Sequence, residues 1–339
     1  MKILIIGGTG TISQAVTELA AARGHEIWLL NRGQRDHGLG KRVHNLVADK
    51  NNRAAMRAAL GDLTFDAVAN FIAFTAEELA DDVALFLGRT AQYLVISSAS
   101  VYQKPPNHYR ITESTPAHNP FWLYSRNKIA LENAAMAAYR EKGFPVTIVR
   151  PSYTYSQSSV PGLFGLGFQH FERLRQGKPL IVHSDGQTLW QMTWNEDFAL
   201  GFVGLLGNPR ALGETFHITS DEVLTWNQIF QTMGRAIGVE PKLVGMPVEF
   251  IGRAEQSVYD GLKGDKMYSL VLDNSKIKSV VPDYQAKVSF YEGMRRCLAW
   301  LEKNPRAADA GLAGSAKIDR LLGLWEKALA EARPAEATR

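Results

Sequence analysis

A short apolar run meets a glycine-rich turn at residues 2–13, which read KILIIGGTGTIS. The apolar residues 3–6 predict a buried strand, and the apolar positions from Ile12 onward repeat at helical spacing. Gly7 permits a tight turn, and Gly10 lets backbone N–H groups approach a pyrophosphate at the N-terminus of the following helix. A glycine loop between a strand and an amphipathic helix therefore predicts a dinucleotide-binding site.

The first half of the chain repeats this alternation of strand and helix. Strands are expected at residues 3–6, 26–30, 45–48, 67–72, 93–97 and 146–150. Helical patterns fill the intervals, and two of them cover residues 75–87 and 123–140. Nearly continuous apolar strands that alternate with helices indicate an α/β fold, in which a parallel sheet is covered on both faces.

The composition argues against several other classes of protein. The 339 residues include one cysteine, Cys297, and no Cys or His spacing suits a metal site, so no disulfide and no metal are expected. No apolar run approaches the roughly 20 residues of a membrane span, and no secretory signal pattern is present. The net charge of +4 is modest and spread along the chain, which argues against a nucleic-acid partner. We expect a cytoplasmic globular protein without membrane contact.

The end of the second expected strand bears on the choice of dinucleotide. Sites for NAD usually place Asp or Glu there to hold the ribose 2′-hydroxyl. This chain instead has Asn31 and Arg32, followed by Arg35. Without a carboxylate to repel a 2′-phosphate, and with two guanidinium groups to pair with it, the site is expected to bind NAD or NADP, with NADP preferred. Asp49, which closes the third strand, is expected to contact the adenine amino group or to cap the next helix.

Two further segments supply candidates for proton transfer. Tyr124 and Lys128 are four residues apart in an expected helix, so the ammonium is expected beside the phenol, where it favours the phenolate. Tyr124 is therefore a candidate general acid or base. Ser98 follows the fifth expected strand and is a candidate to hydrogen-bond the same substrate oxygen.

These residues, in this order, resemble the extended short-chain dehydrogenase/reductase superfamily and within it the NAD-dependent epimerase/dehydratase family. The likeness covers about residues 1–300 and includes the motifs Arg150-Pro151, Gly177-Lys178-Pro179, Asp185-Gly186, Asn195-Glu196-Asp197 and Asp273-Asn274-Ser275-Lys276. The resemblance implies a Rossmann doubly wound parallel sheet with a smaller C-terminal substrate-binding domain. It also implies hydride transfer between a nicotinamide and a carbonyl, and a homodimer formed through the helices at 75–87 and 123–140.

The domain boundaries follow from the same resemblance. Residues 1–155, together with about 186–215, are expected to form the NAD(P)-binding Rossmann domain. Residues 156–185 and 216–300 are expected to form the substrate domain, and residues 301–339 a C-terminal helical tail.

The resemblance also assigns roles to individual residues. The expected catalytic trio is Ser98, Tyr124 and Lys128. Besides Asn31, Arg32, Arg35 and Asp49, the expected cofactor contacts are Gly7, Thr9, Gly10, Thr11, Ile12, Asn70, Phe71, Ile72, Pro151 and Tyr153. The expected substrate contacts are Ser100, Tyr153 and Trp190.

Two departures from the family pattern narrow the expected chemistry. Sugar-nucleotide dehydratases of the family carry an acidic pair directly after the catalytic hydroxyl residue, where this chain has Ala99 and Ser100, so elimination of water is not expected. Nucleotide-sugar enzymes often clamp the substrate pyrophosphate with an arginine where this chain has Trp190. A tryptophan can instead stack on a sugar or on a flat apolar ring.

The expected function is that of an NAD(P)-dependent epimerase or ketoreductase acting on a sugar or nucleotide sugar, because the same trio serves both reactions. Two alternatives stay open. One is an NADPH carbonyl reductase of the dihydroflavonol-reductase type. The other is a non-catalytic RNA-binding protein, since the strand end Asn31-Arg32-Gly33 also resembles chloroplast stem-loop RNA-binding proteins.

Overall fold

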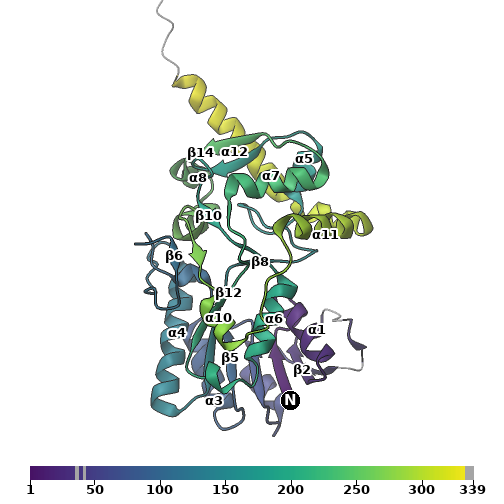
Figure 1. Cartoon of the computed structure of the whole chain (residues 1–339), viewed down its shortest axis with the longest axis vertical. Helices are drawn as coiled ribbons and strands as arrows, with labels where there is room; N and C mark the ends of the chain where they lie inside the picture. Colours follow the sequence, from purple (N-terminus) through teal and green to yellow (C-terminus); the bar gives the residue numbers. More distant parts are fainter. Residues whose placement is uncertain (35–37, 41–42, 333–339) are drawn as a thin grey trace, which may run out of the picture. The chain divides into compact units, whose positions relative to one another are not determined.

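The computed structural model describes residues 1–34, 38–40 and 43–332 (Figure 1). The chain forms two compact units. The first comprises Met1–Ser156, Gln191–Val223 and Leu270–Ser289, and the second comprises Gln157–Trp190, Leu224–Ser269 and the described residues from Phe290 on.

A seven-stranded sheet forms the centre of the first unit within the described residues. Its strand order is β12-β7-β5-β4-β1-β2-β3, and every neighbouring pair is parallel. The strands are β1 (Lys2–Ile6), β2 (Glu26–Asn31), β3 (Val43–Val47), β4 (Ala67–Asn70), β5 (Tyr93–Ile96), β7 (Val146–Pro151) and β12 (Thr215–Ile218). The α/β class and the doubly wound parallel sheet are thereby confirmed. Because the strands are parallel, their carboxyl ends meet at one edge of the sheet.

Helices cover both faces of this sheet, and the side chains of β1 show why. Ile3 and Ile5 point into a core shared with α1 (Ser13–Ala22) and α6 (Asn195–Leu205). Leu4 and Ile6 point into the opposite core, shared with α2 (Arg53–Leu60), α3 (Ala76–Phe86) and α4 (Leu123–Lys142). Alternate residues of a strand face opposite sides, so a strand with helices on both sides is apolar throughout. Figure 1 shows α3 and α4 on one side of the strands and α1 and α6 on the other.

Later segments of the chain complete the first unit. Two short pairings are parallel: β8 (Tyr153–Tyr155) with β11 (Met192–Trp194), and β6 (Arg110–Ile111) with β15 (Val271–Leu272). The segment that contains α10 (Ser275–Val280) buries Ile277 and Tyr284 in the core beneath α6. Residues 216–223 and 270–289 therefore pack in the first unit, whereas the sequence placed them in the substrate domain. Residues 186–190, which the sequence placed in the Rossmann domain, pack in the second unit.

The second unit is built from two strand pairs and several helices. β9 (Leu180–His183) pairs in parallel with β14 (Leu243–Met246), and β10 (Leu189–Trp190) pairs antiparallel with β13 (Leu224–Thr225). The helices are α5 (Gln169–Arg175), α7 (Trp226–Ile237), α8 (Val248–Ala254), α9 (Gln256–Gly261), α11 (Phe290–Lys303) and α12 (Leu312–Glu331). The buried guanidinium of Arg173 donates to Asp319 at 2.7 Å, which ties α12 to α5. None of the described helices has both the length and the apolar character needed to cross a membrane.

Candidate active site

The glycine loop between β1 and α1 is held by the side chain of Ser13. The Ser13 hydroxyl donates to the Gly7 carbonyl oxygen at 2.6 Å and accepts from the Gly10 N–H at 2.9 Å. Gly7 has a φ of +80°, and a Cβ built there would lie 2.6 Å from Cγ2 of Ile72. Only glycine suits both conditions, so the loop keeps its backbone close to the carboxyl end of β4.

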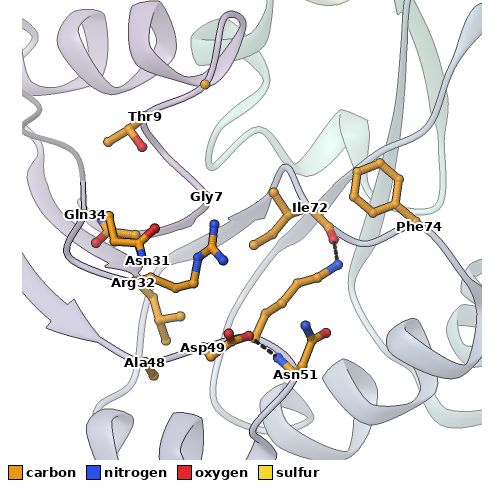
Figure 2. Close-up of a pocket in the computed structure, with 13 residues that line it drawn as sticks. Gly7, Thr9, Asn31, Arg32, Gln34, Ala48, Asp49, Asn51, Ile72 and Phe74 are labelled. Carbon is orange, nitrogen blue, oxygen red and sulfur yellow. Dashed lines mark hydrogen bonds between the residues drawn. The ribbon is translucent and has the colours of Figure 1, made fainter.

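A cavity of about 380 Å³ opens beside this loop, at the carboxyl ends of β1 to β4 (Figure 2). Seven of the predicted cofactor contacts line it: Gly7, Thr9, Gly10, Asn31, Arg32, Asp49 and Ile72. Six further lining residues were not predicted: Leu30, Gln34, Ala48, Lys50, Asn51 and Phe74. Each of the six lies within two positions of a predicted contact in the sequence. Extending each strand end by a few positions would have found them.

The strand end that bears on cofactor choice carries no carboxylate among described residues 31–34. The Asn31 side chain accepts from the Gly33 N–H at 2.7 Å, so it shapes the turn after β2. Figure 2 shows the exposed Arg32 extending over the cavity that it lines. The Asp49 carboxylate accepts from the Asn51 N–H at 2.9 Å and lies at the cavity wall. Arg35, which was predicted beside Arg32, lies outside the described residues.

Lys50 is an unpredicted cation in the cavity wall. Its ammonium donates to the carbonyl oxygen of Ile72 and to Glu78 Oε1, the latter at 2.8 Å. It also lies 4.8 Å from the centre of the Phe74 ring, at a distance suited to a cation–π contact. Glu78 lies on α3, so its pairing with Lys50 follows from the packing of α3 and could not be predicted from sequence spacing.

The predicted contacts Asn70 and Phe71 do not line the cavity. The Asn70 side chain is buried, where its Nδ2 donates to Asp82 at 2.8 Å and its Oδ1 accepts from the Ile72 N–H at 2.9 Å. The Phe71 ring packs on Phe202 of α6, with 5.1 Å between ring centres. Both residues therefore fix the loop after β4 from behind, and Ile72 is the part of that loop that reaches the cavity.

Tyr124 and Lys128 lie one turn apart on α4, as their spacing predicts. The Lys128 ammonium lies 5.9 Å from the centre of the Tyr124 ring. It donates to the carbonyl oxygens of Ala73 and Ile96, each at 2.7 Å, which fixes it between the ends of β4 and β5. Burial lowers the pKa of Lys128 to about 8, although the carboxylates of Glu78 and Glu132 oppose that shift.

A third ring borders the same ammonium. The Phe74 ring centre lies 4.5 Å from the Lys128 Nζ, and Phe74 also lines the cavity. Its side chain is 41% exposed. Phe74 therefore borders both the cavity and the Lys128 ammonium.

Ser98 is only partly buried, and its neighbours are hydroxyl groups. Its side-chain oxygen accepts from the Ser100 N–H at 3.1 Å and lies 2.9 Å from the Ser100 hydroxyl. Ser125, next to Tyr124 on α4, donates to the Ser100 hydroxyl at 2.9 Å. The segment that carries Ser98 is thereby linked to the helix that carries Tyr124.

An ion pair lies one turn further along the same face of α4. Arg150 donates to both carboxylate oxygens of Glu132, at 2.8 and 2.5 Å, and both side chains are buried. Tyr124, Lys128 and Glu132 recur every four residues, so they share this face. The Glu132 carboxylate raises the pKa of Arg150 and opposes the burial that lowers the pKa of Lys128.

The remaining predicted contacts are not among the residues that line the cavity. The Thr11 carbonyl oxygen accepts from Asn195 at 3.0 Å, and Ile12 immediately precedes α1. Pro151 is buried at the end of β7, and Tyr153 is half-buried on β8. In the second unit, Trp190 is 3% exposed.

Two of the predicted substrate contacts are thus buried side chains. The Trp190 indole N–H donates to the Tyr268 carbonyl oxygen at 3.2 Å, and Ser100 is 2% exposed. Within residues 1–34, 38–40 and 43–332, no group of three or more His, Cys, Asp or Glu side chains is placed to hold a metal ion.

Comparison with known sequences decides the family. The sequence model of the NAD dependent epimerase/dehydratase family matches residues 3–219. The chain belongs to this family. A chloroplast stem-loop binding protein of 41 kDa from Arabidopsis thaliana is 28% identical over 74% of this chain and 67% of its own length. The 2′-dehydrokanamycin reductase of Streptomyces kanamyceticus is 22% identical over 92% of this chain and 88% of its own length.

The fold is also that of solved members of the family. A dTDP-glucose 4,6-dehydratase from Bacillus anthracis, determined in complex with NAD, superposes with a TM-score of 0.73 at 18% identity, covering 90% of this chain and 97% of that one. Membership in the epimerase/dehydratase family makes the chain an NAD(P)-dependent oxidoreductase or isomerase. The family resemblance inferred from the sequence is therefore confirmed.

Proposed function

We propose that this chain is an NAD(P)-dependent ketoreductase or epimerase acting on a sugar or nucleotide sugar, with Ser98, Tyr124 and Lys128 as its catalytic residues. The observation that carries the proposal is the placement of the buried Lys128 ammonium 5.9 Å from the Tyr124 ring and beside the nucleotide cavity, across Phe74. A fixed cation next to a phenol suits proton transfer to or from a substrate oxygen.

The cavity supports the dinucleotide part of the proposal. Its glycine loop precedes the N-terminus of α1, where backbone N–H groups and the helix dipole favour a pyrophosphate. Arg32, with no carboxylate among described residues 31–34, supports NADP over NAD because a guanidinium pairs with a 2′-phosphate. When bound, the nicotinamide supplies or accepts the hydride.

The chain's own residues handle the proton. Tyr124 donates its phenol proton to the substrate oxygen in reduction and removes that proton in oxidation. The positive charge of Lys128 stabilises the resulting phenolate, and its position is fixed by the carbonyl oxygens of Ala73 and Ile96. Ser98 orients the substrate oxygen. Ala99 and Ser100 carry no acid, which argues against a dehydratase.

Similarity to the 2′-dehydrokanamycin reductase over 92% of the chain favours reduction of a keto sugar over epimerisation. The two reactions differ in how the nucleotide is used. A reductase exchanges it every turnover, whereas an epimerase retains it. An NADPH carbonyl reductase of the dihydroflavonol-reductase type would exchange the nucleotide as well and is told apart by its substrate.

We further propose a cytoplasmic homodimer formed through α3 and α4, which pack side by side in the first unit and leave Leu123 and Tyr139 of α4 exposed. The single cysteine is buried, which suits a reducing compartment.

Replacing Tyr124 with Phe tests the catalytic assignment. The substitution removes the phenol proton and keeps the ring, so turnover is expected to fall at least about a hundredfold while NADPH affinity stays within about twofold. Activity is measured as NADPH oxidation with 2′-dehydrokanamycin and, separately, with a dTDP-4-keto sugar. Nucleotide affinity is measured by calorimetry. A Tyr124→Phe variant that turns over either ketone at the wild-type rate would refute the assignment.

RNA binding is a second candidate function, favoured by the 28% identity to the chloroplast stem-loop binding protein. It is tested by electrophoretic retardation of a stem-loop RNA over a salt series, because binding through phosphate contacts weakens steeply as salt increases. Absence of retardation at low salt removes this candidate.

A further inference from the structure

Three serine hydroxyls form a chain that runs from the interior of the first unit to Ser98. We propose that Ser125 and Ser100 act as positioning residues that orient the Ser98 hydroxyl so that it can only donate toward the substrate oxygen. The inference deepens the proposed function and rests on it, because it takes Ser98 as the residue that contacts that oxygen.

The distances establish the chain of hydroxyls. Ser125 Oγ donates to Ser100 Oγ at 2.9 Å, and Ser100 Oγ lies 2.9 Å from Ser98 Oγ. The Ser100 N–H also donates to Ser98 Oγ, at 3.1 Å. Asn119 Nδ2 donates to the Ser100 carbonyl oxygen at 2.7 Å and thereby fixes the backbone of the turn that carries Ser100.

The direction of the hydrogen bonds follows from counting protons. A serine hydroxyl donates one hydrogen bond and accepts two. Ser125 donates its proton in the hydrogen bond to Ser100 Oγ, so Ser100 must direct its own proton elsewhere. Among the described residues, the other side-chain partner of Ser100 Oγ is Ser98 Oγ, which therefore accepts that proton in a hydrogen bond. Ser98 Oγ then accepts two hydrogen bonds, one from the Ser100 hydroxyl and one from the Ser100 N–H. Both of its lone pairs are used, and its own proton is left for the substrate.

Burial maintains this direction. Ser125 is fully buried and Ser100 is 2% exposed, whereas Ser98 is partly exposed. Water therefore does not compete for hydrogen bonds with the hydroxyls of Ser125 and Ser100. Of the three hydroxyls, only that of Ser98 is open to solvent or substrate. A buried hydroxyl without a partner is costly, so each serine holds its neighbour in place.

A hydroxyl that can only donate suits the oxygen of a ketone. That oxygen accepts hydrogen bonds and gains negative charge as hydride reaches the adjacent carbon. A donor whose direction is already set stabilises this charge without reorganisation during the reaction. An acidic residue at position 100, as in the dehydratases that the chain resembles, would accept the Ser98 proton and reverse the direction. The serine at position 100 therefore fits carbonyl reduction.

A double-mutant cycle tests this chain of three serine hydroxyls, which we call the serine relay. The variants are Ser98→Ala, Ser100→Ala and the double variant, assayed for kcat and KM with NADPH and the ketone, either 2′-dehydrokanamycin or a dTDP-4-keto sugar, that the wild type reduces. Ser98→Ala is expected to lower kcat about a hundredfold, as loss of one oxyanion donor does elsewhere. Ser100→Ala is expected to lower kcat about tenfold and to leave the KM for NADPH unchanged. In the Ser98→Ala background, the same substitution is expected to change kcat less than about twofold.

Additivity distinguishes positioning from a structural role. If Ser100→Ala lowers kcat by the same factor in both backgrounds, Ser100 does not act through Ser98, and the relay is refuted while the proposed function stands. If Ser98→Ala keeps the wild-type kcat, both the relay and the role of Ser98 are refuted. Ser125→Ala is a fourth variant. It removes the donor to Ser100 Oγ, so the Ser98 hydroxyl can donate to Ser100 instead, and kcat is expected to fall severalfold. An unchanged kcat in Ser125→Ala would remove Ser125 from the relay and overturn the inferred proton direction.

Discussion

The proposed role of Lys128 requires a positive charge, and burying that charge costs folding stability. Burial lowers its pKa from 10.5 to about 8. The unfolded chain therefore binds this proton between pH 8 and 10.5 when the folded chain does not, and stability increases as the pH rises through that window. The shift corresponds to a cost of about 3 kcal/mol below pH 8. This cost is what remains after the carboxylates of Glu78 and Glu132 oppose the effect of burial.

This pKa predicts how the reaction depends on pH. In the proposed mechanism the ammonium form of Lys128 stabilises the phenolate of Tyr124. We therefore expect kcat/KM to fall as the pH rises through about 8, the pKa of Lys128 in the free protein. Arginine stays charged throughout this range. A Lys128→Arg variant is therefore expected to be slower at every pH and to lack the decline near pH 8. Persistence of the same decline in Lys128→Arg would assign it to another group.

Some residues of the site could be predicted from the sequence and others could not. Gly7, Asn31 and Asp49 follow strands whose apolar pattern is clear, so their places at the cavity follow from the parallel sheet. Lys50 follows Asp49 directly, yet its partner Glu78 lies 28 positions away on α3. Asn70 has the same strand-end position as the cavity residues, but its side chain turns inward to Asp82. Sequence position indicates which residues reach the edge of the sheet, whereas packing decides which way each side chain points.

At the scale of elements, the loop after β4 connects the proposed nucleotide cavity to α4. The Ile72 N–H is held by Asn70, and the Ala73 carbonyl oxygen is held by Lys128. The Phe74 N–H donates to Glu78 at 2.6 Å, at the N-terminus of α3. The loop is therefore fixed by β4, α3 and α4. Its position places Ile72 against the glycine loop at Gly7.

The glycine loop yields a prediction with an internal control. Gly7 and Gly24 have nearly the same φ, +80° and +79°, but a Cβ at position 7 would lie 2.6 Å from Ile72, whereas position 24 has nothing within 4 Å. Gly24→Ala is expected to cost about 1 kcal/mol of folding stability from backbone strain alone. Gly7→Ala is expected to cost about 3 kcal/mol, since the steric contact adds to the strain, and to weaken NADPH binding at least about tenfold.

Chemical denaturation measures the stability of both variants, and calorimetry measures their nucleotide affinity. Gly24→Ala is expected to retain wild-type nucleotide affinity. Equal losses of stability and affinity in the two variants would show that the approach of Gly7 to Ile72 is not what shapes the loop.

For the whole molecule, the α/β class could be predicted because strand and helix patterns alternate locally along the chain. The assignment of later segments could not. Ile277 and Tyr284 pack in the core of the first unit, although they lie far from most of its other residues in the sequence. No local sequence pattern around them indicates that this segment belongs to the first unit. The indole of Trp190 packs within the second unit with its N–H satisfied, which composition alone could not distinguish from an exposed stacking surface.

Nucleotide binding by the purified wild-type protein tests the account most directly, because every proposed role depends on a dinucleotide in the cavity between Gly7 and Phe74. Calorimetry with NADPH and NADH, combined with mass spectrometry of nucleotide released from the protein, measures which one binds and whether it exchanges. The account predicts one exchangeable nucleotide per chain, with NADPH bound more tightly than NADH. Binding of neither nucleotide would contradict it.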